Sequence, residues 1–318
     1  MNEPKTLQEA IVYFADADNC LAYLVARRWP NGVECPTCGR TDARFLANQR
    51  KWQCKSVHHH RQFTIKVGTI FEDSPIGLDK WLMTVWMLVN CKNGVSSYEI
   101  ERDVHVTQKT AWFMLHRVRL ALQNGSFDKL KNDVEADETY IGGAARFMHK
   151  NRKEAKGIGP GTVGKVAVMG LLERHGKVRL KVVENIKRHS LHAEIKEGVE
   201  IGAEVFTDAL RSYDTLDVDA NYVHRVIDHA EEYVRGHIHT NGMENFWSLL
   251  KRGLKGTYIS VEPFHLFRYL DEQAFRYNNR QGMNDSERFS LAVSQIVGKR
   301  LTYKQLTGKI QDRETSVN

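Results

Sequence analysis

The stretch that decides the fold of this chain reads VEADETYIGG at residues 134–143. Its apolar–acidic alternation, its β-favouring Thr-Tyr-Ile run and its closing Gly-Gly pair are typical of a β-strand. Because side chains alternate between the two faces of a strand, Glu138 points away from the face that carries Glu135 and Asp137. Carboxylates crowded in this way repel one another and lose hydration unless a cation lies nearby. The stretch is therefore either an edge strand with solvated acids or part of a metal site.

Two later stretches each add one more acid. Residues 203–209, AEVFTDA, form a short apolar run that reaches Asp208 near its end. Residues 239–252, HTNGMENFWSLLKR, have the pattern of a helix with Glu244 in its first turn. An acid on a strand, an acid after a later strand and an acid on a following helix is the order of the RNase-H-like fold.

These motifs resemble those of the DDE transposases of bacterial insertion sequences, specifically the subgroup with an N-terminal zinc ribbon. Besides VEADETYIGG, the resemblance rests on FTDALRSY at 206–213, HTNGMENFWSLLKRGLKGTY at 239–258, CPTCG at 35–39 and WQCKSVHHHRQFTIKVGTIFEDS at 52–74. It extends from about residue 21 to about residue 280, and the motifs agree in order. That agreement is far more specific than any single motif.

The ribbon begins with a Cys-x-x-Cys turn that ends in glycine, which lets two thiolates approach one tetrahedral zinc ion. A redox Cys-x-x-Cys would lie in a strand-to-helix turn and would need no distant cysteine and histidine. We therefore expect one structural Zn2+. The expected ligands are Cys35, Cys38, Cys54 and His58, with His59 and His60 as alternatives to His58.

Residues 78–122 show helical periodicity interrupted by a turn at residues 103–106. Two helices joined by a short turn, the second with polar and basic residues at its start, predict a helix-turn-helix. An ordinary helical hairpin is the alternative. The residues expected at base edges are Thr107, Gln108 and Lys109, and those expected at phosphates are Arg117, His116 and Arg119.

Four more strands are predicted, at residues 166–172, 177–183, 205–207 and 222–227, with a helix at 190–199. We expect an α/β catalytic core of RNase-H-like type, with a mixed five-stranded sheet flanked by helices. A basic, glycine-rich loop at residues 146–165 is expected near nucleic acid. The expected domains are an N-terminal helix and zinc ribbon (1–75), a helix-turn-helix region (76–125), the catalytic domain (126–282) and a C-terminal helical tail (283–318).

The resemblance assigns the chemistry to three acids that hold two Mg2+ ions, for which Mn2+ can substitute. Asp137 would bridge both ions, Asp208 would hold one and Glu244 the other. Lys251 follows Glu244 by two helical turns, so both side chains project from nearly one helix face and the lysine can hold substrate phosphate. Asn241, one turn before Glu244, is the alternative third ligand or a cap of the helix.

The composition agrees with a DNA-binding protein outside membranes. The chain of 318 residues contains 46 Lys and Arg against 39 Asp and Glu, which gives a net charge of +7 and a pI of about 9.1. This balance favours polyanionic partners. No apolar run is long enough to span a membrane, and MNEPKTLQEA at the start lacks the apolar segment of a signal peptide. We expect a cytoplasmic, nucleoid-associated protein.

The function that the resemblance implies is that of a DNA transposase. Such an enzyme binds terminal inverted repeats and cleaves and joins strands by a two-metal mechanism, as a homodimer when the two ends are paired. One alternative is a DNA-binding regulator built from the ribbon and the helix-turn-helix, with an inactive core. Another is an RNase-H-like nuclease without transfer activity.

Overall fold

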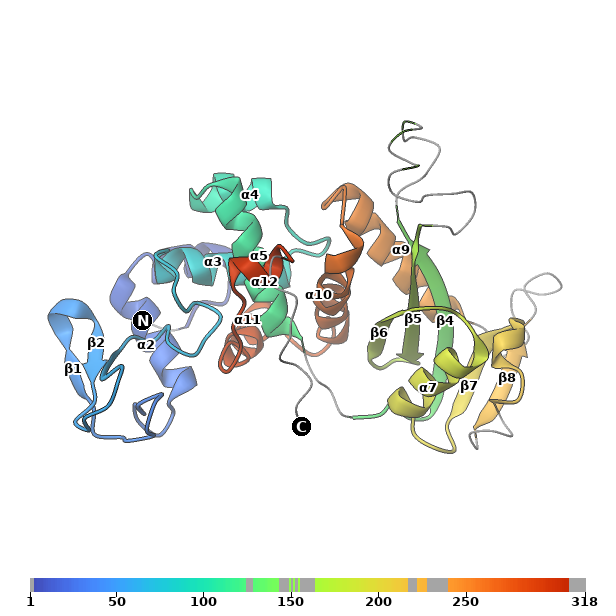
Figure 1. The fold of residues 1–318 in the computed structure, drawn as a ribbon, viewed down its shortest axis with the longest axis horizontal. Coiled ribbons are helices and arrows are strands. Elements are labelled where there is room, and N and C mark those ends of the chain that lie inside the picture. Colours follow the sequence, from blue (N-terminus) through green and yellow to red (C-terminus); the bar gives the residue numbers. More distant parts are fainter. Residues whose placement is uncertain are drawn as a thin grey trace. The chain divides into compact units, whose positions relative to one another are not determined.

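The computed structural model describes residues 3–123, 128–142, 149, 151, 154, 164–216, 222–227 and 240–308. The chain forms two compact units, one made of Met1–Gln123 with Asn279–Asn318 and the other of Asn124–Asn278. Figure 1 labels the helices and strands of both units. The C-terminal segment thus folds with the N-terminal part of the chain.

The first unit opens with two helices and a small sheet. Thr6 and Asp16 cap helices α1 and α2, because their side chains accept hydrogen bonds from the amides of Glu9 and Asp18. Strands β1, β2 and β3 form an antiparallel sheet in that order. The bounds are α1 Leu7–Phe14, α2 Ala17–Arg28, β1 Arg44–Leu46, η1 Ala47–Gln49, β2 Lys51–Gln53 and β3 Gln62–Phe63.

Five further helices complete this unit: α3 Leu78–Asn90, α4 Ser97–Val104, α5 Gln108–Leu122, α11 Asp285–Ser294 and α12 Tyr303–Leu306. Phe289 of α11 packs its ring against Phe14, Tyr23 and Trp86, which come from α1, α2 and α3. Because these aromatic rings bury large apolar areas, they join α11 firmly to the first three helices.

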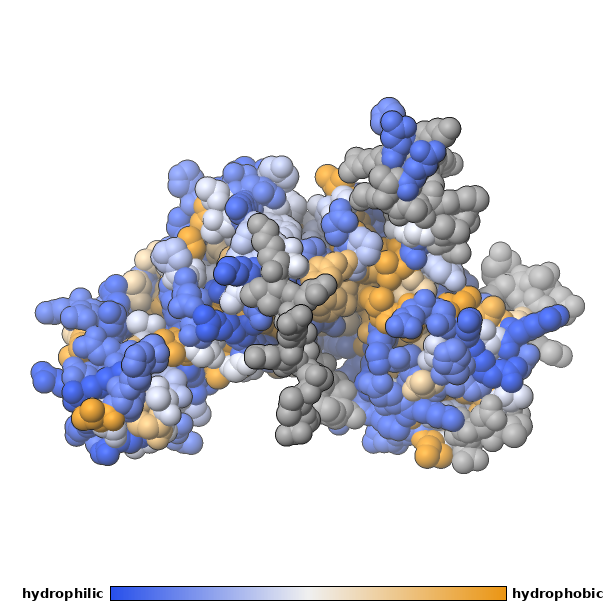
Figure 2. Space-filling model, viewed as in Figure 1, coloured by the Kyte–Doolittle hydropathy of each residue, from blue (hydrophilic) through white to orange (hydrophobic). Residues whose placement is uncertain are grey.

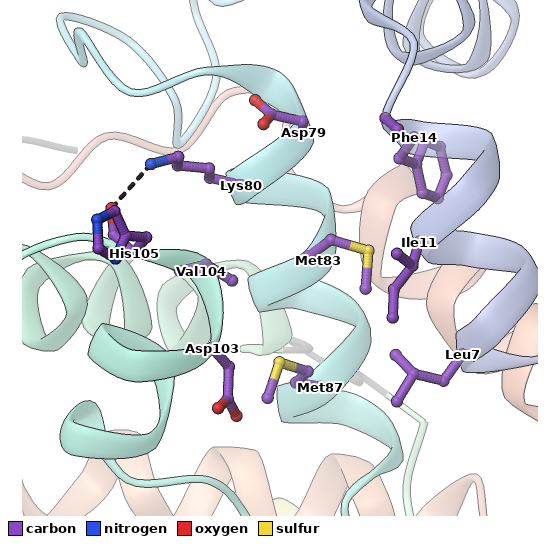
Figure 3. Close-up of a pocket in the computed structure, with 11 residues that line it drawn as sticks. Leu7, Ile11, Phe14, Asp79, Lys80, Met83, Met87, Asp103, Val104 and His105 are labelled. Atoms are coloured by element: carbon purple, nitrogen blue, oxygen red, sulfur yellow. Dashed lines mark hydrogen bonds between the residues drawn. The ribbon is translucent and has the colours of Figure 1, made fainter.

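Helices α4 and α5 stand where the helix-turn-helix was predicted. The turn passes through His105, whose φ of 56° is left-handed, and Thr107 then caps α5 by accepting from the amide of Thr110. Lys80 of α3 donates a hydrogen bond of 2.8 Å to the carbonyl of His105 and so holds the turn (Figure 3). Two helices and a turn do not by themselves identify a DNA-binding motif, so this interpretation stays a prediction.

A groove of about 470 Å³ lies beside this turn, between α1, α3 and α4. Figure 3 shows the residues that line it. Leu7, Ile11, Met83 and Met87 give it an apolar lining. Its polar lining consists of Asp79, Lys80, Asp103 and His105, and the Lys80 ammonium is already bonded to the His105 carbonyl.

The second unit contains the predicted mixed five-stranded sheet, with strand order β6-β5-β4-β7-β8. Strands β4, β5 and β6 run antiparallel in succession, whereas β7 is parallel to β4 and β8 is parallel to β7. Strand β4 contains the acidic stretch and lies at the centre of the sheet, so the edge-strand alternative is wrong. The bounds are β4 Asp133–Ile141, β5 Val166–Glu173, β6 Val178–Val183, β7 Glu204–Asp208 and β8 Val223–Ile227.

Helices cover both faces of this sheet (Figure 1). On one face, Val134 and Ala136 of β4 pack with Leu191 and Ile195 of α7. On the other face, β5 packs against the apolar side of α9 and against α10. The remaining bounds are α7 Arg188–Gly198, η3 Arg211–Tyr213, α9 Asn241–Gly256, η4 Pro263–His265 and α10 Leu266–Asn278.

Hydrophilic residues cover most of the visible surface of both units, and exposed hydrophobic residues occur in small groups (Figure 2). Among the described residues, no helix has both the length and the apolar character that a bilayer span requires.

Candidate active site and metal centre

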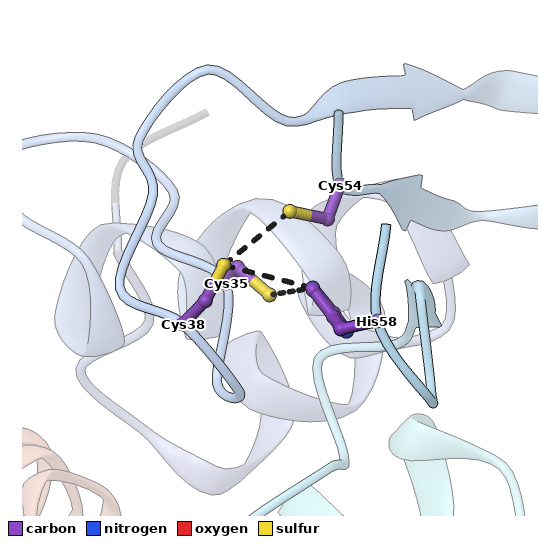
Figure 4. A group of neighbouring side chains, drawn as sticks. All are labelled: Cys35, Cys38, Cys54 and His58. Carbon is purple, nitrogen blue, oxygen red and sulfur yellow. Dashed lines mark hydrogen bonds between the residues drawn. The ribbon is translucent and has the colours of Figure 1, made fainter. Parts of the chain in front are cut away.

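Four side chains of the first unit form a compact metal-binding group: Cys35, Cys38, Cys54 and His58 (Figure 4). One ligand atom from each lies within 4.8 Å of the other three. The Cys38 and Cys54 sulfurs are 3.5 Å apart, and Nε2 of His58 is 3.5 Å from the Cys35 sulfur. Three soft thiolates and one imidazole in this arrangement fit a tetrahedral zinc ion.

Neighbouring hydrogen bonds orient the His58 ring and lower the pKa of the Cys35 thiol, and both effects favour metal binding. Nδ1 of His58 lies 2.7 Å from the carbonyl oxygen of His59, which leaves Nε2 directed at the three sulfurs. Burial alone would raise the pKa of the Cys35 thiol, but hydrogen bonds from the Thr37 and Cys38 amides and from neighbouring thiols lower it to about 7. The structure thus selects His58 from the three adjacent histidines, while His59 and His60 lie outside the group.

Asp137 lies on the face of β4 that α9 covers, and both of its carboxylate oxygens are held. The indole N–H of Trp247 donates to Oδ2 at 2.9 Å, and the amide of Glu138 donates to Oδ1 at 2.8 Å. Among the described residues, Asp137 forms no ion pair with a basic side chain. A half-buried carboxylate held by neutral donors and lacking a basic partner is suited to binding a cation.

The approach of Trp247 depends on Gly170, the register partner of Asp137 on β5. A Cβ added at Gly170 would lie 2.2 Å from Cε of Met243 and 2.7 Å from Cζ2 of Trp247. Because no side chain could occupy that space, glycine is required for α9 to pack this closely over the sheet.

Asp208 ends β7, the parallel neighbour of β4. In the register of these two strands, Asp133 pairs with Glu204 and Glu135 pairs with Phe206, so paired residues are 71 positions apart in the sequence. Asp137 and Asp208 are also 71 positions apart. Continued along both strands, this register places Asp208 level with Asp137 on the adjacent strand, where strands are about 4.8 Å apart. The Leu210 amide holds Oδ1 of Asp208 at 3.1 Å.

The acids act on one another electrostatically. Burial, together with repulsion from Asp208 and Glu244, raises the pKa of Asp137 to about 6, although the bonds from Trp247 and Glu138 oppose that rise. Burial and the charges of Asp137 and Asp208 raise the pKa of Glu138 to about 8. Glu138 accepts a hydrogen bond from the hydroxyl of Tyr213, on the α7 side. The site therefore holds an excess of negative charge that a cation would relieve.

The three acids do not pack into a single ligand shell. Within the described part of the chain, the Cys–His group is the only set of three or more such side chains whose ligand atoms all lie within 4.8 Å of one another. Glu244 is exposed in the first turn of α9, Asn241 is the first residue of that helix, and Lys251 lies two turns after Glu244. A two-ion site is compatible with this spread, because each outer acid needs to reach only one ion.

Sequence reasoning missed the role of Glu135, which is 1% exposed. Its Oε2 accepts a hydrogen bond of 2.9 Å from the Met243 amide in the first turn of α9, and its Oε1 pairs with Arg174 at 3.1 Å. The N-cap residue of α9 is Thr240, not Asn241, and it makes no side-chain cap hydrogen bond, so Glu135 of β4 caps the helix instead. The signal was present in the sequence, since Glu135 shares the strand face of Asp137.

The expected DNA-contacting residues of α5 already have partners within the first unit. Thr107 caps α5, Gln108 donates to the hydroxyl of Ser97 at 2.9 Å, and the Lys109 ammonium lies 4.8 Å from the centre of the Tyr303 ring. Thr107 and Lys109 are nevertheless exposed.

The expectation that Arg117 contacts phosphate is wrong. Its side chain is buried and its guanidinium donates to the carbonyls of Ile70, Glu72 and Leu301. Buried donors of this kind organise the core and are withdrawn from solvent. His116 and Arg119 are buried as well.

Most of the predicted basic loop at residues 146–165 lies outside the described residues.

Comparisons with known proteins show the class of protein to which this α/β core and zinc-binding group belong. Residues 129–278 match the model of the ISXO2-like transposase domain, and residues 15–60 match that of the transposase zinc-ribbon domain. The chain belongs to this family of zinc-ribbon transposases.

Two relatives illustrate the match. A transposase-like protein of Haemophilus influenzae is 36% identical over 105 residues, which cover 33% of this chain and 84% of that protein. A protein of the transposable element ISH50 of Halobacterium salinarum is 29% identical over 253 residues, which cover 75% of this chain and 82% of that protein.

Proposed function

We propose that this chain is a transposase that cleaves and joins DNA strands at a site formed by Asp137, Asp208 and Glu244. The observation that carries the proposal is the parallel register of β4 and β7, because its continuation along both strands would put Asp137 level with Asp208. The sheet order and directions agree with an RNase-H-like core. The raised pKa of Asp137 adds support, because it reflects burial of the carboxylate and, to a lesser extent, repulsion from Asp208 and Glu244.

The donor set fits Mg2+, which prefers oxygen ligands and few protein carboxylates. Asp137 would contact both ions, Asp208 one and Glu244 the other, with Asn241 as the alternative to Glu244. Two ions bound there would activate the attacking oxygen and stabilise the leaving oxygen at phosphorus.

The rest of the chain orients the site. Trp247 and the Glu138 amide fix the carboxylate plane of Asp137, and Glu135 fixes the end of α9 that carries Glu244. Lys251 supplies a positive charge on α9 for a substrate phosphate. The zinc ribbon and the α4–α5 pair are the proposed binding region for the terminal repeats, and a homodimer is proposed for the paired ends.

The test uses the full chain with DNA that carries the terminal inverted repeats flanking its gene, together with a target plasmid. We expect strand cleavage and joining that require Mg2+ or Mn2+. Asp137→Asn, Asp208→Asn and Glu244→Gln should each abolish both steps while repeat binding persists. Asn241→Ala separates the two candidates for the third ligand, because only the true ligand is required for cleavage.

The same assay discriminates the alternatives. Binding by the wild-type chain without cleavage at any metal concentration would indicate a regulator with an inactive core. Cleavage without joining would indicate a nuclease. Either result would overturn the transposase proposal.

A further inference from the structure

A pocket of about 480 Å³ lies in the second unit, on the α9 side of the sheet. Its walls come from the end of β4, Lys165 just before β5, the second half of α9 and the loop that follows α9. This volume is in the range of pockets that hold small organic ligands. None of the three proposed catalytic acids lines it.

Three lysines surround the pocket, namely Lys165, Lys251 and Lys255, and no acidic residue lines it. Within the described residues, none of the three ammonium groups forms an ion pair or a hydrogen bond. By contrast, Lys181 on β6 of the same unit pairs with both Glu194 and Glu197. The pocket therefore carries positive charge that the described part of the chain does not neutralise, which favours an anionic ligand.

The lining between these lysines is apolar, with contributions from Ile141, Leu254 and Val261. Gly142 lets Lys165 approach the end of β4, because an added Cβ would lie 3.1 Å from Cγ of that lysine. An apolar lining ringed by ammonium groups matches a ligand that combines a flat apolar body with phosphate. A nucleotide has this chemistry.

Ile259 also lines the pocket and is unusual in two respects. Its side chain is 82% exposed, and its φ of 60° is in the left-handed region that β-branched residues avoid. Backbone strain of this kind concentrates at ligand-binding sites. Apolar side chains that project in this way can insert beside nucleic-acid bases and unstack them.

The pocket continues the surface on which the acids lie. Ile141 shares the strand face of Asp137 and follows it by four residues, about 13 Å along β4. Lys251 follows Trp247, the hydrogen-bond partner of Asp137, by one turn of α9. A DNA strand with a phosphate at Asp137 would thus reach the pocket within a few nucleotides.

We propose that this pocket binds one unpaired nucleotide of the DNA strand on which the enzyme acts. The base lies against the apolar lining with Ile259 at its edge, and the lysines hold the adjoining phosphates. The inference rests on the proposed function, because the strand that enters is the one whose phosphate lies at Asp137. An acidic peptide would satisfy the lysines, but it would leave the apolar lining and Ile259 without a matching group.

The test measures binding of the full chain to fluorescent single-stranded oligonucleotides in EDTA, so that catalysis plays no part. One probe is a normal 15-nucleotide strand and the other has the same backbone with abasic sites. The Lys165→Gln/Lys255→Gln chain should bind both probes at least tenfold more weakly. Its salt dependence, log K against log salt, should be shallower by about 1.4, since each lost phosphate contact removes about 0.7.

Ile259→Ala should weaken binding of the normal strand about fivefold, from lost apolar contact, and leave binding of the abasic strand and the salt slope unchanged. Ile201→Ala and Lys187→Gln are matched controls on exposed residues elsewhere in the unit, and both should bind like the wild type. In a second measurement, p-benzoylphenylalanine in place of Ile259 should crosslink to the normal strand upon irradiation, and the same group at Ile201 should not.

Three results would contradict the proposed nucleotide binding. Ile259→Ala could lose the same affinity for the normal and the abasic probe, or the control variants could lose as much affinity as the pocket variants. A polyglutamate peptide of matched charge could also compete as well as the oligonucleotide. If the wild-type chain cleaves and joins DNA but all pocket variants bind both probes normally, the nucleotide-binding pocket is wrong and the transposase proposal stands. If the variants show the expected binding pattern but the wild-type chain cleaves no DNA with Mg2+, the transposase proposal is wrong and the single-strand binding pocket stands.

Discussion

The indole N–H of Trp247 donates a hydrogen bond of 2.9 Å to Oδ2 of Asp137 and so ties helix α9 to the central strand of the sheet. The contact joins residues 110 positions apart and is possible because Gly170 leaves the space between them open. Two elements that carry proposed catalytic acids are thereby held in a fixed relationship.

Trp247→Phe keeps most of the apolar ring but removes the donor to Asp137. A hydrogen bond to an ionised carboxylate lowers its pKa, so the pKa of Asp137 should rise above its present value of about 6. Protons and cations compete for this carboxylate. We therefore expect the acidic limb of the Mg2+-dependent cleavage profile to move toward higher pH, with a loss of about fivefold at pH 6 that approaches tenfold at lower pH for a shift of one unit. Rates that converge toward pH 8 support this explanation, whereas a uniform loss at every pH argues against it.

Gly170→Ala should displace α9 from the sheet, because the new methyl group would overlap Met243 and Trp247. Overpacking of this kind costs about 1–3 kcal/mol of unfolding free energy, and the misplaced helix should abolish cleavage. Urea unfolding of the two chains measures the first effect. Gly256→Ala is the control, since nothing lies within 4 Å of its added Cβ, and its stability should be unchanged or slightly higher. Equal stability of the Gly170 variant and the wild type would contradict the close packing.

Glu135→Ala should destabilise the second unit by about 1–3 kcal/mol, because it removes the cap from the Met243 amide and leaves Arg174 without its buried partner. Glu135→Gln keeps an acceptor for the amide and should recover part of the loss. Denaturant unfolding gives the comparison. Glu184→Ala, an exposed glutamate of the same unit, should change stability by less than about 0.5 kcal/mol. If alanine and glutamine at position 135 behave alike, the cap contributes little.

Glu138→Gln should stabilise the metal-free chain at neutral pH. The pKa of Glu138 is raised from an ordinary value to about 8, chiefly by burial. A raised folded-state pKa contributes stability that is complete below the unfolded value, near 4.5, and is lost as the pH rises toward 8. We expect the glutamine variant to melt several degrees above the wild type at pH 8 and the difference to disappear near pH 4. Thermal scans in EDTA across this range provide the measurement. A constant difference would show that ionisation of Glu138 is not responsible.

His58→Ala should lower the zinc content of the purified chain below one ion and unfold the ribbon, because structural zinc holds such small sheets together. His59→Ala and His60→Ala are matched controls from the same run of histidines and should retain one ion per chain. Elemental analysis counts the zinc, and proteolysis detects the loosened ribbon. Zinc loss in His59→Ala equal to that in His58→Ala would mean that His58 is not the fourth ligand.

The sequence by itself determined the features that depend on local pattern. Alternation at residues 134–139 predicted both the strand and its two faces, because successive side chains of a strand always point to opposite sides of the sheet. The spacing of Cys35, Cys38, Cys54 and His58 predicted the zinc group, because a knuckle and a short hairpin bring such residues together. The order of later strands and helices predicted the mixed sheet.

Only the tertiary structure decided which polar residues have buried partners. Arg117 has the helical position of a surface arginine, yet the carbonyls that surround it come from residues 70, 72 and 301, and no local pattern foretells them. The cap of α9 by Glu135 and the dependence of Trp247 on Gly170 arise in the same way, from contacts across more than 70 residues of sequence. Periodicity specifies which face of an element is apolar, whereas the partner of a buried charge is fixed only when distant segments pack together.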